Sequence, residues 1–372
     1  MVACQEDQAG SRQRRDVTAA RDANLGTMAV REALRFDEAR LAAWMAENIA
    51  EYEGPLAVEQ FKGGQSNPTY KLVTPKRAYV LRRKPPGPLL KGAHAVDREA
   101  RVLQALGTVG FPVAHVHGLC TDDAVIGTWF YVMEMVEGRI FWDATLPEIP
   151  GEERPAYFEA LAGTLAQLHG IDYAAIGLAD FGRPGNYFER QIGRWSKQYL
   201  EDVEAGRDQN MDRLIEWLPA NIPPGDEASI VHGDFRFDNA IFHPTEPRVV
   251  AVLDWELATL GHPLADFAYT AMIYRVPPSI VGGLGGADLA ALNIPSEAEF
   301  IAAYCRRTGR DGIAAYGFYV AFNLFRLAAI FHGIKGRLIR GTAASEQAQE
   351  RVAALPALTE IAWHEACRAA GN

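Results

Sequence analysis

The sequence predicts an α+β fold made of two lobes, a small lobe with an antiparallel sheet and a larger lobe that is mainly helical. Two patterns predict this class. Short strand-like runs separated by Gly, Pro and Asn fill the chain between residues 56 and 135, and long helical patterns run from residue 152 to the end, apart from a strand pair around residues 240–253. A chain of 372 residues, 48% of them hydrophobic, is long enough to form two cores.

The elements of the small lobe follow one another in a simple order. A helix that begins after Asp37 has one apolar face, made of Leu41, Trp44, Met45 and Ile49. Strands are expected at residues 56–61, 69–74, 77–83, 113–120 and 125–135. A helix over residues 94–107 ends on Gly107 and separates the third strand from the fourth.

The composition and the spacing of apolar residues along the chain predict four segments. Residues 1–27 mix charges of both signs with Gly, Gln and Ser, which is typical of a disordered extension. The small N-lobe is expected over residues 28–133, a hinge over 134–138 and the helical C-lobe over 139–372. The run "GGLGG" at residues 282–286 leaves open whether residues 270–300 form a mobile lid.

Composition excludes several classes of partner. The formal net charge of -10 argues against a nucleic-acid partner, which needs a basic surface. Four distant cysteines form neither a zinc motif nor a disulfide framework and fit a reducing compartment. With no run of about 18 apolar residues and no signal-peptide core, we expect no membrane span. These features predict a cytoplasmic protein that acts on a small molecule.

The stretch "VHGDFRFDNAIF", residues 231–242, carries the chemistry. Asp234 and Asn239 precede a predicted hairpin, and Asp254 stands at the exit of that hairpin, so three oxygen-bearing side chains come close together. Mg²⁺ prefers such ligands and shares them with phosphates, and Asp234 is then free to accept a proton from a hydroxyl. The same residues also fit ordinary turn chemistry, with Asp254 as a helix cap.

The order of motifs favours the first interpretation. "HGDFRFDN" matches the catalytic-loop pattern H-x-D-x-x-x-x-N of protein-kinase-like folds, and "LDWE" takes the place of D-F-G after the hairpin. Together with "GGQSNPTYKL", these motifs make residues 37 to 340 resemble the aminoglycoside phosphotransferase, or choline-kinase-like, family of small-molecule kinases. The resemblance implies a protein-kinase-like two-lobed fold, ATP bound between the lobes, and transfer of its γ-phosphate to a substrate hydroxyl with Mg²⁺.

The resemblance also implies roles in nucleotide binding. Residues expected to approach the phosphates are Gly63, Gly64 and Ser66, although the loop departs from G-x-G-x-x-G. Alternation in "YVLR" places Val80 and Arg82 on one face, with Val80 over adenine and Arg82 toward the phosphates. The fold usually has lysine in place of Arg82, and the two are not interchangeable. Glu99 is expected to pair with Arg82, and adenine to contact the backbone of Glu134 and Val136.

For the C-lobe, the resemblance implies that Asn239 and Asp254 ligate Mg²⁺ and that Asp234 orients and deprotonates the acceptor hydroxyl. His232 and Asp266 are expected to support this loop. Residues 181–200 and 318–340 combine aromatic with basic side chains, of which Arg190 and Arg326 are the predicted substrate contacts.

Those two segments and "YVLRRKPPG" most resemble kinase domains that occur alone in bacteria or fused to acyl-CoA dehydrogenase-like proteins. This implies a hydroxyacyl substrate such as a 4-hydroxyacyl-CoA. Aminoglycoside, choline, homoserine and sugar kinases remain alternatives, as does a nucleotide-binding regulatory protein without catalysis. A metal-dependent hydrolase would use His232, Asp234, His243 and Asp254.

Overall fold

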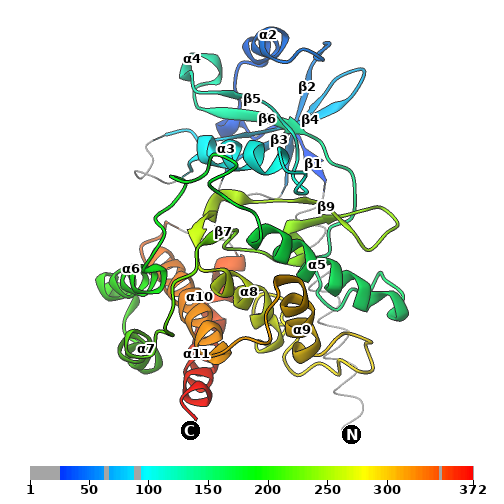
Figure 1. The fold of residues 1–372 in the computed structure, drawn as a ribbon. Coiled ribbons are helices and arrows are strands. Elements are labelled where there is room, and N and C mark those ends of the chain that lie inside the picture. Colours follow the sequence, from blue (N-terminus) through cyan, green and yellow to red (C-terminus); the bar gives the residue numbers. More distant parts are fainter. Residues whose placement is uncertain (1–25, 63–66, 88–93, 343–345, 372) are drawn as a thin grey trace, which may run out of the picture. The chain divides into compact units, whose positions relative to one another are not determined.

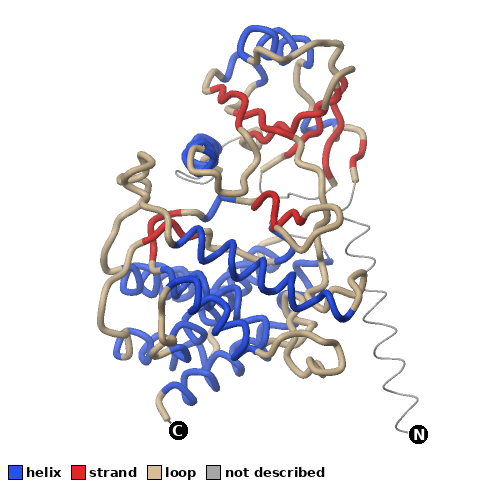
Figure 2. Tube along the Cα trace, turned by 45° about the vertical axis from the view of Figure 1, so that its right-hand side comes forward, coloured by secondary structure: helices blue, strands red, loops and turns tan. Residues whose placement is uncertain are grey.

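The computed structural model describes residues 26–62, 67–87, 94–342 and 346–371. The chain forms two compact units. Unit 1 contains the described residues up to Trp142 together with Ile241–Glu246 and Val250–Glu256, and unit 2 contains Asp143–Ala240, Pro247–Val249 and the chain from Leu257 onward. The larger sheet belongs to unit 1 and the long helices belong to unit 2 (Figures 1 and 2). The predicted α+β class is confirmed.

Unit 1 is built on one antiparallel sheet with the strand order β1-β2-β3-β4-β6-β5. The strands are β1 (Thr27–Met28), β2 (Ala57–Phe61), β3 (Thr69–Val73), β4 (Ala78–Arg83), β5 (Val116–Cys120) and β6 (Phe130–Glu134). The five predicted strands are present. The two-residue strand β1 was not predicted, because two residues are too few to show a period of two.

The strand predicted over residues 125–135 begins later than expected. A short helix, α4 (Asp123–Ile126), occupies its first part. Asp122 caps the start of α4 by accepting a hydrogen bond from the backbone N–H of Ala124, and Gly127 ends it with φ +85°, which glycine adopts without strain. The strand β6 therefore starts at Phe130.

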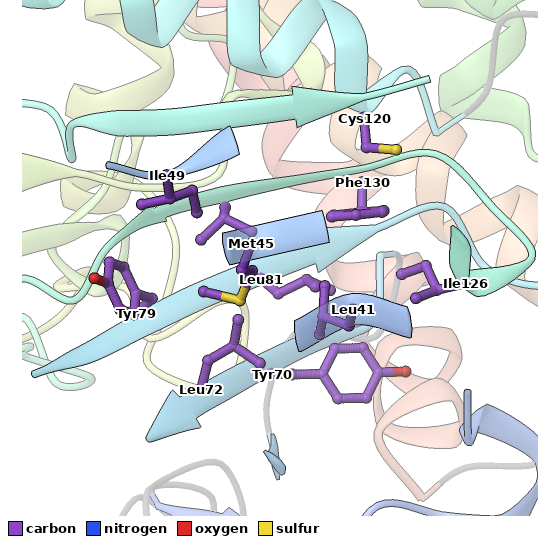
Figure 3. Close-up of a cluster of buried hydrophobic side chains, with 11 residues drawn as sticks. Leu41, Met45, Ile49, Tyr70, Leu72, Tyr79, Leu81, Cys120, Ile126 and Phe130 are labelled. Atoms are coloured by element: carbon purple, nitrogen blue, oxygen red, sulfur yellow. The ribbon is translucent and has the colours of Figure 1, made fainter. Parts of the chain in front are cut away.

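One face of the sheet carries the core of unit 1. The helix α2 (Glu38–Asn48), capped by Asp37 as predicted, lays its apolar face on the sheet. The cluster in Figure 3 contains Leu41, Met45, Ile49, Tyr70, Leu72, Tyr79, Leu81, Cys120, Ile126, Phe130 and Val132. Alternation along β4 sends Tyr79 and Leu81 into this cluster and leaves Val80 and Arg82 for the other face, where Glu99 of α3 (Val96–Gly107) meets Arg82.

Unit 2 is a helical assembly around one central helix. The helices are α5 (Arg154–His169), α6 (Tyr187–Glu201), α7 (Gln209–Ala220), α8 (Pro263–Ala271), α9 (Glu297–Thr308), α10 (Tyr316–Ile339) and α11 (Glu346–Ala369). α10 packs against α6, α7, α8 and α11. Short 3₁₀ turns occur in both units: they are η1 (Glu32–Leu34), η2 (Gly151–Glu153), η3 (Val203–Ala205), η4 (Phe237–Asn239), η5 (Trp255–Leu257) and η6 (Met272–Tyr274).

The central helix is long and apolar. By length and composition α10 could cross a membrane, with a mean hydropathy of 1.3 over an 18-residue window, although polar residues such as Asn323 and Arg326 interrupt its apolar sequence. Of that window, 89% is buried inside the structure, which is the position of a core helix.

Two strand pairs flank the loop that contains Asp234. β7 (Ser229–Val231) pairs with β10 (Thr259–Gly261), a pair of three-residue strands that the sequence analysis missed. The predicted pair is β8 (Ala240–Phe242) with β9 (Val249–Val252). Most of this second pair belongs to unit 1, whereas the sequence analysis placed all of residues 139–372 in the helical lobe.

A close backbone contact attaches this hairpin within unit 1. Arg139 and Phe242 exchange two backbone hydrogen bonds of 2.8 Å. A Cβ atom on the preceding Gly138 would lie 2.3 Å from the carbonyl oxygen of Phe242. Glycine is therefore required at position 138 by space.

The glycine-rich run in unit 2 is tightly packed. A Cβ atom on Gly283 would lie 2.0 Å from the carbonyl oxygen of Val276, and one on Gly285 would lie 2.8 Å from the same atom. The N–H of Gly285 donates to that oxygen at 2.8 Å. These glycines allow two backbone segments to approach each other, so their presence is explained without a mobile lid.

Candidate functional site

Arg82 is the centre of the polar cluster in unit 1. Its Nε lies 2.7 Å from Oε2 of Glu99, so the predicted ion pair is present. Its Nη2 lies 2.7 Å from Oδ1 of Asp254 and 3.5 Å from Oε2 of Glu256. Both Arg82 and Glu99 are buried. One guanidinium therefore contacts three carboxylates, which leaves an excess of negative charge around it.

The charge state of Arg82 follows from these neighbours. Burial by itself lowers the pKa of Arg82, but Glu99, then Tyr131 and Asp254, outweigh burial and raise the pKa above its ordinary value. Arg82 therefore stays charged at every pH at which the protein is folded.

Two further side chains fix Glu99 by hydrogen bonds. The side-chain amide of Asn67 donates to its Oε1 at 2.8 Å, and the hydroxyl of Tyr131 donates to its Oε2 at 3.2 Å. Asn67 in turn contacts His94 through a 2.8 Å hydrogen bond. Asn67 follows the predicted phosphate loop directly, while Gly63, Gly64 and Ser66 themselves lie outside the described residues.

Asp254 has an unusual backbone conformation. Its φ is +64°, in the left-handed region that only glycine, asparagine and aspartate enter at low cost. The chain before it is anchored, because the N–H of Val252 donates to the carbonyl of Pro112 at 2.9 Å. Only Oδ1 of Asp254 contacts Arg82, and the side chain is 37% exposed, so Oδ2 can serve as an oxygen ligand for Mg²⁺.

The residues predicted to meet adenine are placed in or next to the sheet. Val80 is buried on the Arg82 face of β4 and pairs with Met133 of β6. The N–H of Glu134 donates to the carbonyl of His115 at 2.8 Å, so only the carbonyl of Glu134 could bond a base. Val136 follows β6 and is half-buried. The predicted adenine contacts are otherwise untested.

In unit 2, Asp266 of α8 fixes the backbone of the loop from His232 to Asn239. The backbone N–H groups of His232 and Gly233 donate to its two carboxylate oxygens at 2.7 and 2.8 Å. The Nδ1 atom of His232 accepts from the N–H of Asp234 at 3.1 Å. The predicted supporting contacts of His232 and Asp266 are thus present.

Asp234 itself is held by three neighbours. The hydroxyl of Tyr269 donates to its Oδ1, and Nε of Arg236 lies 3.4 Å from the same oxygen. The Nδ2 atom of Asn239 donates to the carbonyl of Asp234 at 2.8 Å and to its Oδ2 at 3.0 Å. The Asp234 side chain keeps 24% of its surface exposed. A carboxylate that is fixed yet accessible can orient a substrate hydroxyl and accept its proton.

The same contacts orient Asn239. Because its Nδ2 is committed to Asp234, its Oδ1 remains as the ligand atom that a hard cation prefers. Both predicted metal residues, Asn239 and Asp254, thus present an oxygen that suits Mg²⁺. Within the described ranges, no three His, Cys, Asp or Glu side chains gather as a metal cluster, and the hydrolase alternative gains no support.

Tyr269 is the residue that the sequence analysis missed. It is buried, and burial followed by the charge of Asp234 raises its pKa well above the ordinary tyrosine value, so it remains a hydrogen-bond donor. Asp266, Tyr269 and Thr270 are spaced i, i+3, i+4 in "ADFAYT", which places their side chains on one face of a buried helix. Thr270 completes the set by donating to the carbonyl of Phe235 at 2.8 Å. That spacing was the available signal.

The two predicted substrate contacts have different surroundings. Arg326 is buried in α10, its Nη2 donates to the carbonyl of Gly233 at 2.8 Å, and its guanidinium lies 5.3 Å from the centre of the Tyr269 ring. This position favours support of the loop over direct substrate contact, because the group is committed inside the protein. Arg190 of α6 donates to the carbonyl of Arg183 at 2.6 Å and is half-exposed.

Comparison with known proteins decides the family. Residues 57–319 match the model of the APH phosphotransferase enzyme family. The chain belongs to this family. The APH match covers Arg82 and Glu99 as well as the loop around Asp234.

Relatives of this APH protein carry the names of acyl-CoA dehydrogenases. Human acyl-CoA dehydrogenase family member 11 is 42% identical over 322 residues, which is 84% of this chain and 41% of that protein. Mouse family member 10 is 43% identical over 312 residues, 83% of this chain and 29% of that protein. The Arabidopsis thaliana probable acyl-CoA dehydrogenase IBR3 is 45% identical over 336 residues, 85% of this chain and 41% of that protein. The chain thus spans less than half of these relatives.

Solved structures show the same fold. A Ralstonia eutropha protein, provisionally assigned as an aminoglycoside phosphotransferase, is 48% identical with a TM-score of 0.83, over 90% of this chain and 99% of that chain. An aminoglycoside phosphotransferase in complex with ADP and hygromycin B is 14% identical with a TM-score of 0.57, over 87% of this chain and 98% of that chain. Choline kinase from Cryptosporidium parvum is 11% identical with a TM-score of 0.55, over 90% and 95%. The protein-kinase-like fold expected from the motifs is confirmed.

Proposed function

We propose that this APH-family protein is an ATP- and Mg²⁺-dependent kinase that transfers the γ-phosphate to a hydroxyl group of a small molecule. The observation that supports the proposal most strongly is the set of hydrogen bonds that fixes Asp234. Its carboxylate is held by Tyr269 and Asn239, remains partly exposed, and stands on a loop whose backbone is fixed by Asp266. Phosphoryl transfer depends mainly on such positioning.

Unit 1 supplies the groups for the nucleotide. Arg82 is a permanent cation held in place by Glu99, and its fork-shaped guanidinium suits phosphate oxygens. Related structures of the fold contain ADP or an ATP analogue, which supports nucleotide binding here. Mg²⁺, when bound, neutralises charge on the phosphates, and Asp254 and Asn239 each offer an oxygen for it.

The acceptor we favour is a hydroxy acid or a hydroxyacyl-CoA. The relatives that share 42–45% identity with the chain are named acyl-CoA dehydrogenases, proteins whose substrates are acyl thioesters by name. Aminoglycoside, choline and homoserine kinases remain the alternative enzymes. A nucleotide-binding regulatory protein without catalysis is the alternative outside the enzymes, and the fixed geometry of Asp234 speaks against it.

The proposal is tested by comparing the unchanged protein with Asp234→Asn. Both proteins are incubated with MgATP and a panel of 4-hydroxyacyl-CoA, free hydroxy acids, aminoglycosides, choline and homoserine, and mass spectrometry detects an added phosphate. We expect Asp234→Asn to lower turnover by about 100- to 10,000-fold and to leave ATP affinity unchanged. Asp311→Asn, an exposed aspartate outside the site, is the matched control. Equal loss of ATP binding and turnover in Asp234→Asn would show that the assignment is wrong.

A further inference from the structure

A cavity of about 610 Å³ lies within unit 2, between α6, α7 and the segment that leads to β7. The helices α6 and α7 lie side by side (Figure 1). The volume is within the range of small-molecule sites. Among the described residues, none of those that hold Asp234 lines this cavity, so it is separate from the site described above.

Most of the lining is apolar. α6 contributes Ile192, α7 contributes Ile215 and Pro219, and the chain after α7 contributes Ile222 and Pro223. Ile215, Ile222 and Pro223 are half-buried, and Pro219 is exposed. Apolar side chains that remain partly in contact with water on a concave surface favour a ligand with an apolar body.

Gly193 keeps this cavity open. It lies in the interior of α6 and lines the cavity, although glycine is unfavourable inside a helix. A Cβ atom at Gly193 would have no described atom within 4 Å. A Cβ atom on Gly336 of α10, by contrast, would overlap the carboxylate of Asp202. Packing therefore explains Gly336 but not Gly193, whose missing side chain leaves room for a ligand.

Ser196 offers the cavity a polar contact. It lines the cavity and is 9% exposed. Among the described residues, its Oγ has no hydrogen-bond partner. A buried hydroxyl in that situation has given up its bonds to water without replacing them. Because the hydroxyl turns about a single side-chain bond, it can rotate to bond a polar group of a ligand.

The charge of the lining is negative. Glu189 and Asp226 line the cavity, whereas its described lining contains no lysine, arginine or histidine. Asp226 accepts from the N–H of Asn186 at 3.2 Å, and Glu189 is exposed. The basic residues Arg194 and Lys197 of α6 line a different cavity. Electrostatic complementarity therefore favours a cationic ligand over an anionic one.

The polar groups are spaced along one face of α6. Glu189 and Ser196 are seven residues apart, about 10 Å along the helix, and Ile192 and Gly193 lie between them. We propose that this cavity is a second small-molecule site, which binds an elongated primary amine. Its ammonium group lies beside Glu189, its apolar chain along Ile192 and Gly193, and a hydroxyl group at its other end bonds Ser196. This site is independent of the proposed kinase reaction.

The experiment measures binding of three probes by calorimetric titration. 8-Amino-1-octanol carries the amine, the apolar chain and the hydroxyl. 1,8-Octanediol has the same chain without the charge, and octylamine lacks the hydroxyl. Each probe is titrated into the unchanged protein, Gly193→Leu, Glu189→Gln, Ser196→Ala and Asp234→Asn, and the melting temperature of each protein is measured.

Two further variants are matched controls. Gly312→Leu makes the same substitution at an exposed glycine that also has open space around the Cβ and does not line the cavity. Glu216→Gln removes the same charge from an exposed glutamate of α7 that does not line it either. Both controls, and Asp234→Asn, should bind 8-amino-1-octanol like the unchanged protein.

We expect Gly193→Leu to weaken binding of 8-amino-1-octanol at least tenfold, because the leucine side chain occupies the cavity. Its melting temperature should not fall, since leucine favours a helix more than glycine does. Glu189→Gln should weaken binding of the amine roughly two- to fivefold and leave 1,8-octanediol unchanged. Ser196→Ala should abolish the difference in affinity between 8-amino-1-octanol and octylamine.

The outcomes separate this inference from the proposed function. Absence of binding to the unchanged protein, or equal affinities of Gly193→Leu and the unchanged protein, overturns the site. Equal or tighter binding of 1,8-octanediol overturns the preference for an amine. A loss in Asp234→Asn as large as in Gly193→Leu would mean that the probe binds near Asp234, which also contradicts a second site. Amine binding that depends on Gly193, in a protein that phosphorylates no acceptor, supports this inference and counts against the kinase proposal.

Discussion

Arg82 shows at the residue scale why arginine differs from lysine. Its Nε faces Glu99 while its Nη2 faces Asp254 and Glu256, so one rigid fork connects carboxylates that come from different parts of unit 1. A lysine ammonium is a single point of charge and could not span both directions equally. Arg82 therefore fixes the position of Asp254.

Removal of this charge should destabilise unit 1. We expect Arg82→Met to lower the free energy of unfolding by about 3–5 kcal/mol, because Glu99 is left buried without its cation. Urea unfolding measures the change. The double variant Arg82→Met with Glu99→Gln should recover part of the loss, and an undiminished loss in the double variant would mean that the ion pair is not its cause.

Tyr269 allows a test that leaves the fold intact. Tyr269→Phe removes only the hydroxyl that donates to Asp234, so we expect kcat to fall about tenfold with the KM for ATP unchanged. Tyr274→Phe, which loses a hydrogen bond to the carbonyl of Pro295, is the matched control. Equal kcat values for Tyr269→Phe and the unchanged protein would show that this hydrogen bond does not orient Asp234.

At the scale of elements, α8 holds the loop from His232 to Asn239 in place. Three of its side chains bond to the loop at His232, Gly233, Asp234 and Phe235. Asp266 is the most connected of them, since Nε2 of His169 also lies 3.2 Å from its Oδ2 and Nδ1 of His169 contacts the hydroxyl of Tyr304 at 2.7 Å. The loop geometry therefore depends on the charge of one buried carboxylate.

This dependence predicts how stability changes with pH. Burial by itself raises the pKa of Asp266, but the hydrogen bond and charge of His169, then His232, outweigh it, so the pKa lies below its ordinary value. A depressed pKa stabilises the folded state above the unfolded value of about 3.9, and the contribution is lost as pH falls through the folded pKa. We expect the stability difference between the unchanged protein and Asp266→Asn to be constant near neutral pH and to shrink below about pH 4, as measured by urea unfolding.

If the stability difference between the two proteins stays constant down to pH 2, Asp266 does not cause the loss of stability at acid pH. Glu227, paired with Arg310, and Asp202, paired with Arg340, also have lowered pKa values and contribute to the acid limb of both proteins. Their contributions cancel in the comparison because both proteins retain them.

The glycine-rich segment gives a further prediction at this scale. Gly283→Ala should destabilise the protein by about 1–3 kcal/mol, because the added methyl group overlaps the carbonyl oxygen of Val276. Gly312→Ala, at a position with open space around the Cβ, should change the melting temperature much less. Equal melting temperatures for the two variants would indicate that the segment is free to move aside.

Elements with a long apolar period could be predicted from the sequence. Among the short strands, β8 and β9 were predicted from two apolar runs around the turn "HPTEPR", whereas β1, β7 and β10 were not. The face of Leu41, Met45 and Ile49 spans more than two turns, so α2 was evident. The pairs β1–β2 and β7–β10 involve two or three residues each and show no period. Asp234, Asn239 and Asp254 could be selected as candidates because their spacing matches the kinase-like motifs, and their roles stay predictions. Tyr269 was missed because its role depends on folding that brings its hydroxyl to Asp234, a residue far from it in the sequence.

At the scale of the whole molecule, nucleotide binding should couple to stability. A ligand that binds only the folded protein adds about 2.7 kcal/mol at 100 times its Kd. We expect MgATP to raise the melting temperature and EDTA to remove most of that increase. Asp254→Asn should lower the gain from Mg²⁺, since one anionic oxygen is lost while asparagine tolerates the left-handed backbone. An identical increase with and without Mg²⁺ would argue against a metal-dependent nucleotide site.

The paired hydrogen bonds between Arg139 and Phe242 have a consequence for protein engineering. The chain leaves unit 1 after Trp142 and returns to it at Ile241. Arg139, shortly before the exit, and Phe242, directly after the return, are paired like residues of neighbouring strands, which lie about 5 Å apart. Residues 143–240 of unit 2 thus begin and end within four residues of the bridge between Arg139 and Phe242. A connector of a few residues from Trp142 to Ile241 would turn unit 1 into one continuous sequence, in which Arg82, Glu99 and Asp254 could be studied as a miniature nucleotide-binding module.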